Sequence, residues 1–253
     1  MSLIESDGIA VVRLENGPLT PLTAAMRARL HELADILASR RDIRAVVLTS
    51  ASARALSVGS DIAEFPRDGA TGRETSVAEH RAYRALEELP QPVIAVLRGH
   101  TIGGGLELAL ATDLRIAEQN TALGFPEVRL GVFASGGGTQ RLPALIGRGR
   151  AAEMLMLGNL IDARTALTWG LVTRVVPEGD GENAAVEMAR EIARLPRRGV
   201  QATKTCLRRG LLDGRTAGDA AEIDAIADLY TSPDAVEGRR AFLDKRTPVF
   251  THL

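Results

Sequence analysis

Hydrophobic residues follow two different spacings along the chain, and the spacing changes from one segment to the next. Short apolar runs, typical of β-strands, occupy residues 8–14, 45–49, 93–97 and 114–117. Between them, apolar residues recur every three or four positions, which predicts helices over residues 22–39, 77–89 and 106–112. This alternation predicts an α/β domain whose strands pair largely in parallel. We interpret the polar stretch 66–76 as a mobile surface loop.

The pattern becomes almost entirely helical after residue 136. Helices are predicted over residues 139–146, 150–157, 163–169, 182–195, 199–209, 217–230 and 233–245, with one short strand over 171–176. The helix 217–230 carries an apolar stripe that includes Ile223, Ile226 and Tyr230, which indicates a packing or subunit contact. We therefore expect a core over residues 1–195 and a helical oligomerisation region over residues 196–253.

Composition and charge narrow the classes of protein to which this chain can belong. Hydrophobic residues make up 45% of the 253 positions, which is enough for a sizeable core. The 31 basic and 32 acidic residues are interspersed, so we expect no nucleic-acid partner. No apolar run is long enough to span a membrane, and no leader pattern begins the chain, so we expect a cytoplasmic protein. The single cysteine, Cys206, excludes an internal disulfide and is interpreted as a small core residue.

The chemistry is expected around a run of three glycines, Gly103–Gly105, which joins the strand 93–97 to the helix 106–112. Glycines at such a junction let backbone N–H groups face a ligand, and these groups bind an anion or an oxygen that becomes one. Two carboxylates flank the run, Glu107 in the helix and Glu127 in a following loop. These parts are sufficient for proton transfer beside a stabilised oxyanion.

Other interpretations of this stretch have to be weighed. A dinucleotide-binding fingerprint needs a third glycine where Leu108 stands, and a Walker A loop needs a lysine that the stretch lacks. The glycines of this run, and those of a second run at 136–138, could serve only to start a helix close to a strand. Glu107 could be an exposed first-turn residue that interacts with the helix dipole.

Nucleophilic and metal-dependent sites are less well supported by the sequence. Ser60 and Ser135 have glycine neighbours, but neither lies in a G-x-S-x-G pattern. His100 lies close to the glycine run and is the candidate histidine base. The other histidines are expected on the surface or at the terminus, and they are His31, His80 and His252. No cluster has metal-ligand spacing, so we predict no metal.

Several motifs in order give the chain a family resemblance. They are RALSVGSDI, GHTIGGGLELALATDLRIA, FPEVRLG, SGGGTQRLP, DARTALTWGLVTRVVP and AFLDKRTPVF. With these motifs, the sequence resembles the enoyl-CoA hydratase/isomerase (crotonase) family over almost its whole length. The resemblance implies a spiral α/β core of ββα units and a helical C-terminal trimerisation region, assembled as a homotrimer or a homohexamer.

The resemblance also implies roles for particular residues. The backbone N–H groups of Ser60 and Gly104 would form an oxyanion hole for the thioester carbonyl. Glu127 would deliver a proton to the α-carbon, while Glu107 would orient and deprotonate the water that adds at the β-carbon. Coenzyme A would be part of the substrate, with no permanently bound cofactor. Residues implied to contact it are Arg54, Ala55, Ser57, Val58, Asp61 and Ile62, together with Phe242 and Lys245, often across a subunit boundary.

The expected activity is therefore the reversible hydration of 2-enoyl-CoA thioesters to 3-hydroxyacyl-CoA. A Δ3-Δ2 enoyl-CoA isomerase or a specialised acyl-CoA dehydratase of the same family is an alternative, because moving a double bond can require only one base. A non-catalytic acyl-CoA-binding protein with the same fold is an alternative of another class.

Overall fold

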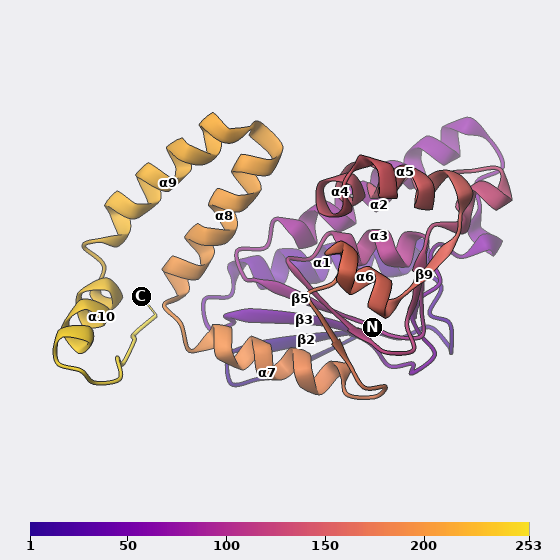
Figure 1. Ribbon diagram of the computed structural model, residues 1–253. Helices are drawn as coiled ribbons and strands as arrows, with labels where there is room; N and C mark the ends of the chain where they lie inside the picture. Colours follow the sequence, from indigo (N-terminus) through magenta and orange to yellow (C-terminus); the bar gives the residue numbers. More distant parts are fainter. Residues whose placement is uncertain (253) are drawn as a thin grey trace.

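Two sheets form the N-terminal region of the protein in the computed structural model, which describes residues 1–252 (Figure 1). The larger sheet contains, in spatial order, β1 (Ser2–Ser6), β2 (Ile9–Leu14), β3 (Ala45–Ser50), β5 (Val93–Leu97), β7 (Leu114–Glu118) and β10 (Arg174–Val176). The smaller sheet contains β4 (Ala55–Ser57), β6 (His100–Ile102), β8 (Ala122–Gly124) and β9 (Leu160–Asp162). Neighbouring strands are parallel except in the pairs β1–β2 and β8–β9.

The chain builds the two sheets as a spiral. Strands β3, β5 and β7 enter the larger sheet, and the strand after each of them, β4, β6 or β8, enters the smaller one. A helix then follows each pair of strands, and these helices are α2 (Gly69–Glu87), α3 (Gly104–Leu110) and the 3₁₀ helix η2 (Pro126–Leu130). The predicted α/β class and the spiral of ββα units are therefore confirmed.

The central strands of the larger sheet, β3, β5 and β7, are buried on both faces, which explains why they read as continuous apolar runs. Val47, Ile94 and Val96 point to a cluster shared with α7 (Gly181–Ala193). The alternate residues, such as Leu48 and Ala95, point into the main core beneath α1 (Ala24–Ser39) and α2. Figure 1 shows α7 on one side of β2, β3 and β5 and the other helices of the core on the opposite side.

The start of α1 brings a distant loop into place. Thr23 caps the helix by accepting a hydrogen bond from the Met26 N–H at 3.2 Å, so Leu22 lies just outside it. The Leu22 N–H donates to Gly59 O at 2.8 Å, and the Asp61 N–H donates to Leu22 O at 3.1 Å. The loop that contains Ser60 is therefore held from both sides by main-chain hydrogen bonds.

The predicted loop 66–76 is wrong over residues 69–76, because α2 begins at Gly69. Asp68 is the N-cap, and its Oδ1 accepts a hydrogen bond from the Thr71 N–H at 2.9 Å. The first turns of α2 project beyond the core and are mostly exposed, so they carry no apolar stripe. The cap, and not hydrophobic spacing, marks the start of this helix.

Most other helices lie close to their predicted positions. The remaining helices of the core are η1 (Ile62–Glu64), α4 (Gly138–Ile146), α5 (Arg148–Leu157) and α6 (Ala163–Trp169). The C-terminal region consists of α8 (Arg197–Asp213), α9 (Arg215–Leu229) and α10 (Pro233–Leu243). The predicted strand 171–176 shortens to β10. Within residues 1–252, no helix is long and apolar enough to cross a membrane.

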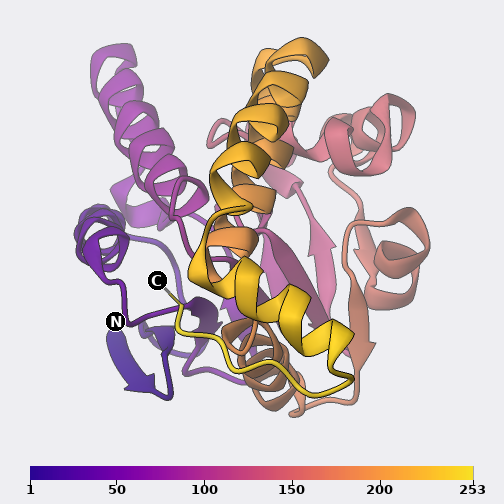
Figure 2. The ribbon, with the colours of Figure 1, turned by 90° about the vertical axis from the view of Figure 1, so that its left-hand side faces the viewer.

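The C-terminal helices extend away from the sheets in Figure 1, and they lie in front of the sheets when the molecule is viewed from that side (Figure 2). Helices α8 and α9 pack closely, because a Cβ on Gly218 would lie 2.9 Å from the Gly210 Cα. Lys204 connects α8 to the core through its Nζ, which is 2.8 Å from Asp113 Oδ2. The prediction that Cys206 is a core residue is wrong, because Cys206 is only half-buried in the groove between α8 and α9. The division into regions 1–195 and 196–253 stays a prediction.

Candidate active site

Three parallel strands of the smaller sheet place the candidate residues at one edge. Strand β4 pairs with β6, and β6 pairs with β8, all in parallel, so the carboxyl ends of the three strands lie side by side. Ser60 follows β4, Gly104 follows β6, and Glu127 follows β8. In α/β folds the carboxyl edge of parallel strands is where ligands usually bind. The topology therefore brings together residues that are far apart in the sequence.

The two glycine loops at this edge are in close contact. A Cβ on Gly59 would lie only 2.9 Å from the Gly104 backbone nitrogen. Gly59 and Gly103 both have positive φ angles, of 92° and 56°, which residues with side chains rarely adopt. Glycine is therefore required at these two positions for both steric and conformational reasons.

The backbone amides of Ser60 and Gly104 are without an acceptor in the part of the chain that the structure describes. The hydrogen bonds on either side of Ser60 use Gly59 O and the Asp61 N–H, while Gly104 lies in the first turn of α3, where amides lack helical partners. Within residues 1–252, neither amide donates a hydrogen bond to another residue. Two free donors in neighbouring loops are suited to bind one oxygen that gains negative charge.

Glu107 is buried on α3, with only 2% of its surface exposed, which excludes the interpretation as a solvated first-turn residue. Its Oε1 accepts hydrogen bonds from the Gly136 N–H at 2.7 Å and the Gly138 N–H at 2.8 Å. Burial and then the charge of Glu79 raise the pKa of Glu107 from 4.5 to about 8, against the two amides, which act in the opposite direction. The second glycine run thus holds this carboxyl group.

Glu127, in η2, lies against the first glycine run. A Cβ on Gly103 would be 2.8 Å from Glu127 Oε1, and Oε2 is buried without a hydrogen-bond partner among residues 1–252. Burial is the main cause that raises the pKa of Glu127 from 4.5 to about 7, and the charge of Glu79 adds to it. The charge of Glu127 in turn raises the pKa of Glu107. The two carboxyl groups can therefore take up and release protons near neutral pH.

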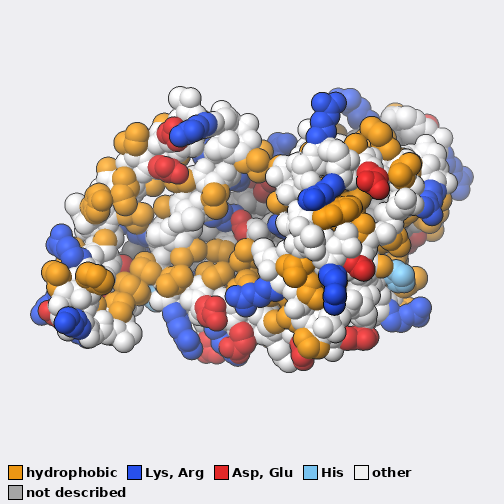
Figure 3. All heavy atoms as spheres, in the orientation of Figure 1, with side chains coloured by type: hydrophobic (Ala, Val, Ile, Leu, Met, Phe, Trp, Pro, Cys, Tyr) orange, Lys and Arg blue, Asp and Glu red, His pale blue; other side chains and the backbone are white. Residues whose placement is uncertain are grey.

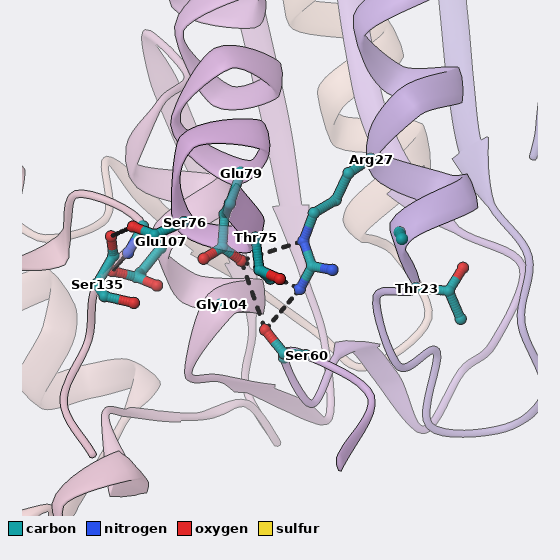
Figure 4. Close-up of polar contacts among 12 residues, drawn as sticks. Thr23, Arg27, Ser60, Thr75, Ser76, Glu79, Gly104, Glu107 and Ser135 are labelled. Atoms are coloured by element: carbon teal, nitrogen blue, oxygen red, sulfur yellow. Dashed lines mark hydrogen bonds and ion pairs between the residues drawn. The ribbon is translucent and has the colours of Figure 1, made fainter. Parts of the chain in front are cut away.

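The sequence analysis did not single out three further residues of the site. Two of them, Glu79 and Arg27, lie beside Ser60 in Figure 4, and the third, Tyr83, hydrogen-bonds to Glu79. Glu79 and Tyr83 lie on α2, and Arg27 lies on α1. All three are buried, and Glu79 Oε1 is 3.2 Å from Arg27 Nε and 3.0 Å from the Tyr83 hydroxyl. A signal was present, because Glu79 lies four residues before Tyr83 and Tyr83 lies three residues before Leu86, so all three share one helical face.

The residues implied to contact coenzyme A divide into two groups. Those from residue 54 to residue 62 adjoin Ser60, and among them the Ser57 Oγ accepts a hydrogen bond from the Gly59 N–H at 3.0 Å. Phe242 and Lys245 belong to the C-terminal region, and Figure 1 shows α10 at the opposite end of the molecule from α3. One chain alone therefore does not bring these two residues to the glycine loops.

The histidine and metal alternatives gain no support from the geometry. His100 is exposed on β6. Within residues 1–252, no group of three or more His, Cys, Asp or Glu side chains is arranged to hold a metal ion.

Comparison with known proteins gives the same relationship over the whole chain. The sequence model of the enoyl-CoA hydratase/isomerase family matches residues 5–252. A short-chain-enoyl-CoA hydratase of Clostridium acetobutylicum is 32% identical over 96% of this chain and 95% of its own length. A crotonyl-CoA hydratase of Syntrophomonas wolfei is 33% identical over 90% of each chain.

The fold agrees with that of solved structures. The crystal structure of an enoyl-CoA hydratase from Bacillus anthracis superimposes with a TM-score of 0.94 and 33% identity, over 100% of this chain and 99% of the other. The sequence and the fold thus both match members of one family over nearly the whole chain. The protein is an enzyme that belongs to the enoyl-CoA hydratase/isomerase family.

Proposed function

We propose that this enzyme catalyses the reversible hydration of 2-enoyl-CoA thioesters to 3-hydroxyacyl-CoA. The observation that carries the proposal is the presence, at one sheet edge, of two amides and two carboxyl groups. The Ser60 and Gly104 amides donate to no residue within 1–252, and the pKa values of Glu107 and Glu127 are raised to about 8 and about 7. Addition of water to a conjugated thioester needs both features, because charge develops on the carbonyl oxygen while one proton leaves the attacking water and another reaches the α-carbon.

The two amides would act on the thioester carbonyl. As the water oxygen bonds to the β-carbon, the electrons of the double bond move toward the carbonyl and form an enolate. The enolate oxygen accepts hydrogen bonds from the Ser60 and Gly104 N–H groups. Removal of a single donor of this kind in other enzymes costs about 3–4 kcal/mol of transition-state stabilisation. Because both amides belong to the folded backbone, little reorganisation would oppose the reaction.

The two glutamates would handle the protons. Glu107 takes one proton from the attacking water, and Glu127 gives one proton to the α-carbon, so that the product gains one molecule of water and the pair retains one proton. Dehydration follows the same path in reverse. Two interacting carboxyl groups that titrate near neutral pH can share this proton as a coupled pair.

A spectroscopic assay tests this proposal. Purified enzyme is incubated with crotonyl-CoA, and hydration removes the absorbance of the conjugated enoyl group. Glu107→Gln and Glu127→Gln should each lower kcat by orders of magnitude with little change in KM. Glu118→Gln is a matched control, because Glu118 is also buried but lies on β7 near α7, outside the site.

The same assay separates the alternatives. An isomerase leaves crotonyl-CoA unchanged and moves the double bond of a 3-enoyl-CoA, whereas a non-catalytic protein binds the thioester without turnover. Equal rates for the wild type and both glutamine variants would contradict the roles assigned to the two carboxyl groups. The presence of both glutamates favours hydration over isomerisation.

Coenzyme A would enter this site only as part of the substrate, with no other cofactor. The segment from Arg54 to Ile62 is the proposed contact for it, because this segment adjoins Ser60 and leaves the Ile62 side chain 65% exposed. Phe242, which is 82% exposed, and Lys245 are proposed to contact it from a second subunit. Phe242→Ala should therefore raise KM for the thioester more than it lowers kcat.

A homotrimer, alone or doubled into a homohexamer, is the proposed assembly. The C-terminal helices expose large apolar side chains that a monomer would leave in water, and Figure 3 shows hydrophobic side chains gathered over α9 and α10. Leu211→Glu should shift the mass measured by light scattering toward the monomer. Met156→Glu is the control, because Met156 is also apolar and exposed but lies on α5, whereas Leu211 lies on α8. Cytoplasmic location and the absence of a nucleic-acid partner stay predictions.

A further inference from the structure

A third carboxylate, Glu79, is buried at the centre of the site. Only 4% of its surface is exposed, although it lies on a helix whose first turns are largely in solvent. Its Oε1 accepts a hydrogen bond from the Arg27 Nε–H at 3.2 Å and faces the Tyr83 hydroxyl at 3.0 Å. A carboxylate is costly to bury, so its position in the site requires a physical explanation.

Glu79 lies between the oxyanion hole and Glu107. A Cβ on Gly104 would be 3.3 Å from Glu79 Oε1. A Cβ on Gly136 would be 3.0 Å from Glu79 Cδ and 2.7 Å from Glu107 Oε2, so both carboxyl groups face the space at Gly136. Both glycine runs thus leave room for Glu79 as well as for the catalytic pair.

The cation that compensates Glu79 is on the far side. Figure 4 shows Glu79 between Glu107 and Arg27, so Arg27 is the more distant charge from Glu107. The Arg27 side chain is 5% exposed and also donates to the Ser60 Oγ at 2.6 Å, and Ser60 Oγ is 3.4 Å from Glu79 Oε1. Arg27 therefore pairs with Glu79 from the side away from Glu107, so the negative charge of Glu79 lies nearer to Glu107 than the positive charge of Arg27 does.

Tyr83 is the second buried partner of Glu79. Its hydroxyl is 3.0 Å from Glu79 Oε1 and 3.0 Å from Gly104 O, so it donates its single proton to one acceptor or the other. Burial and then the charge of Glu79 raise the pKa of Tyr83 well above its usual range, so the phenol stays neutral. Tyr83 therefore connects Glu79 to the oxyanion-hole residue Gly104 without adding charge.

We propose that Glu79 is a positioning residue whose negative charge keeps one proton on the Glu107–Glu127 pair at neutral pH. This inference rests on the proposed hydration, which needs a carboxyl group that still holds its proton when the α-carbon is ready to receive it. A nearby like charge disfavours ionisation of a carboxyl group, and the effect is larger in a buried site. Glu79 acts through the pair and not on the substrate.

Charged and titratable side chains from four elements surround Glu79. Arg27 faces it from α1, Tyr83 from α2, Glu107 from α3 and Glu127 from η2. Arg141 of α4 donates to Gly136 O at 3.2 Å, but its charge is paired with Glu87. The neighbouring His80 points into the outer groove between α1 and α2.

Carbon NMR of the glutamate carboxyl groups tests the inference without any need for activity. The Glu107 and Glu127 resonances are assigned by their glutamine variants and followed from pH 4 to pH 10. Glu79→Gln should move both titrations to lower pH, with a shift on the order of one pH unit for Glu107. Unchanged titration of Glu107 and Glu127 in Glu79→Gln would overturn the inference.

A double variant separates the charge of Glu79 from that of its partner. Glu79→Gln alone leaves Arg27 buried and unpaired, which by itself lowers the titration and weakens the fold. Arg27→Met with Glu79→Gln removes both charges at similar volume. The Glu107 titration should still lie below that of the wild type in the double variant. If it returns to the wild-type position, the effect belongs to the unpaired arginine and the inference is wrong.

The rate of hydration provides a second readout. Active enzyme needs one proton on the pair, so kcat/KM falls at low pH when the base is protonated and at high pH when the acid is ionised. In Glu79→Gln, the fall of kcat/KM at low pH and its fall at high pH should both move to lower pH. Glu118→Gln is the matched control, because Glu118 is also buried and pairs with Arg98 at 3.4 Å. This variant should leave the pH dependence of kcat/KM unchanged. Absence of hydration by the wild type would contradict the proposed function, while the NMR titration would still decide the role of Glu79.

Discussion

Replacement of Glu107 by glutamine should remove a large part of the pH dependence of stability. The folded protein raises the pKa of Glu107 to about 8 from 4.5, chiefly through burial. Between these two values the native state holds a proton that the unfolded chain has released. By linkage, the contribution of Glu107 to stability is therefore greatest below pH 4.5, decreases as pH rises toward about 8, and is constant above it.

The size of the effect follows from the difference between the two pKa values. At about 1.36 kcal/mol for each pH unit, a rise from 4.5 to about 8 corresponds to about 5 kcal/mol when the whole range is crossed. Glutamine keeps the acceptor oxygen that the Gly136 and Gly138 amides need, but it carries no ionisable proton. Wild type and Glu107→Gln should therefore have similar stability near pH 5, and the variant should be more stable by several kcal/mol at pH 9.

Urea unfolding followed by circular dichroism at one-unit intervals from pH 5 to pH 9 measures this difference. Protein concentration is held constant, because any association of subunits also contributes to the apparent stability. Glu153→Gln on the exposed surface of α5 is the control and should run parallel to the wild type. Parallel curves for wild type and Glu107→Gln would show that Glu107 is not held in a proton-retaining environment.

Two further changes test the packing of the site and of the C-terminal helices. Gly136→Ala should lower kcat at least tenfold and destabilise the fold by about 1–3 kcal/mol, because the new Cβ would lie 2.7 Å from Glu107 Oε2. Gly149→Ala is the control, because a Cβ there has no atom within 4 Å, and it should leave activity unchanged. Both variants are measured by rate assay and by thermal unfolding. Lys204→Met should speed amide hydrogen exchange in α8 without changing kcat, because it removes the 2.8 Å contact with Asp113 that connects α8 to the core. Exchange as slow as in the wild type would contradict this role of Lys204.

Local sequence signals predicted the elements whose structure depends on neighbouring residues. The helix 163–169 was predicted with the bounds that α6 has, and Gly170 follows it in the left-handed conformation. The apolar runs of β3, β5 and β7 were found because both faces of the larger sheet are covered. The motif order gave the family resemblance, which the matching family model confirms.

Elements stabilised by distant partners were missed. Strands β4, β6, β8 and β9 have three residues each, which is too short for any alternation to appear. They exist because each pairs with a strand far away in the sequence. The early turns of α2 were missed as well, because their residues face solvent and carry no stripe.

The sequence by itself determined the alternation of strands and helices, the two glycine runs and the presence of Glu107 and Glu127. Only the tertiary structure decided that the carboxyl ends of β4, β6 and β8 meet, which places Ser60, Gly104 and Glu127 together. It also decided that Glu79 is buried beside them, and hence how tightly the carboxyl groups hold their protons. The physical reason is that burial and charge proximity depend on which distant segments pack together, whereas spacing along the chain reports only on neighbours.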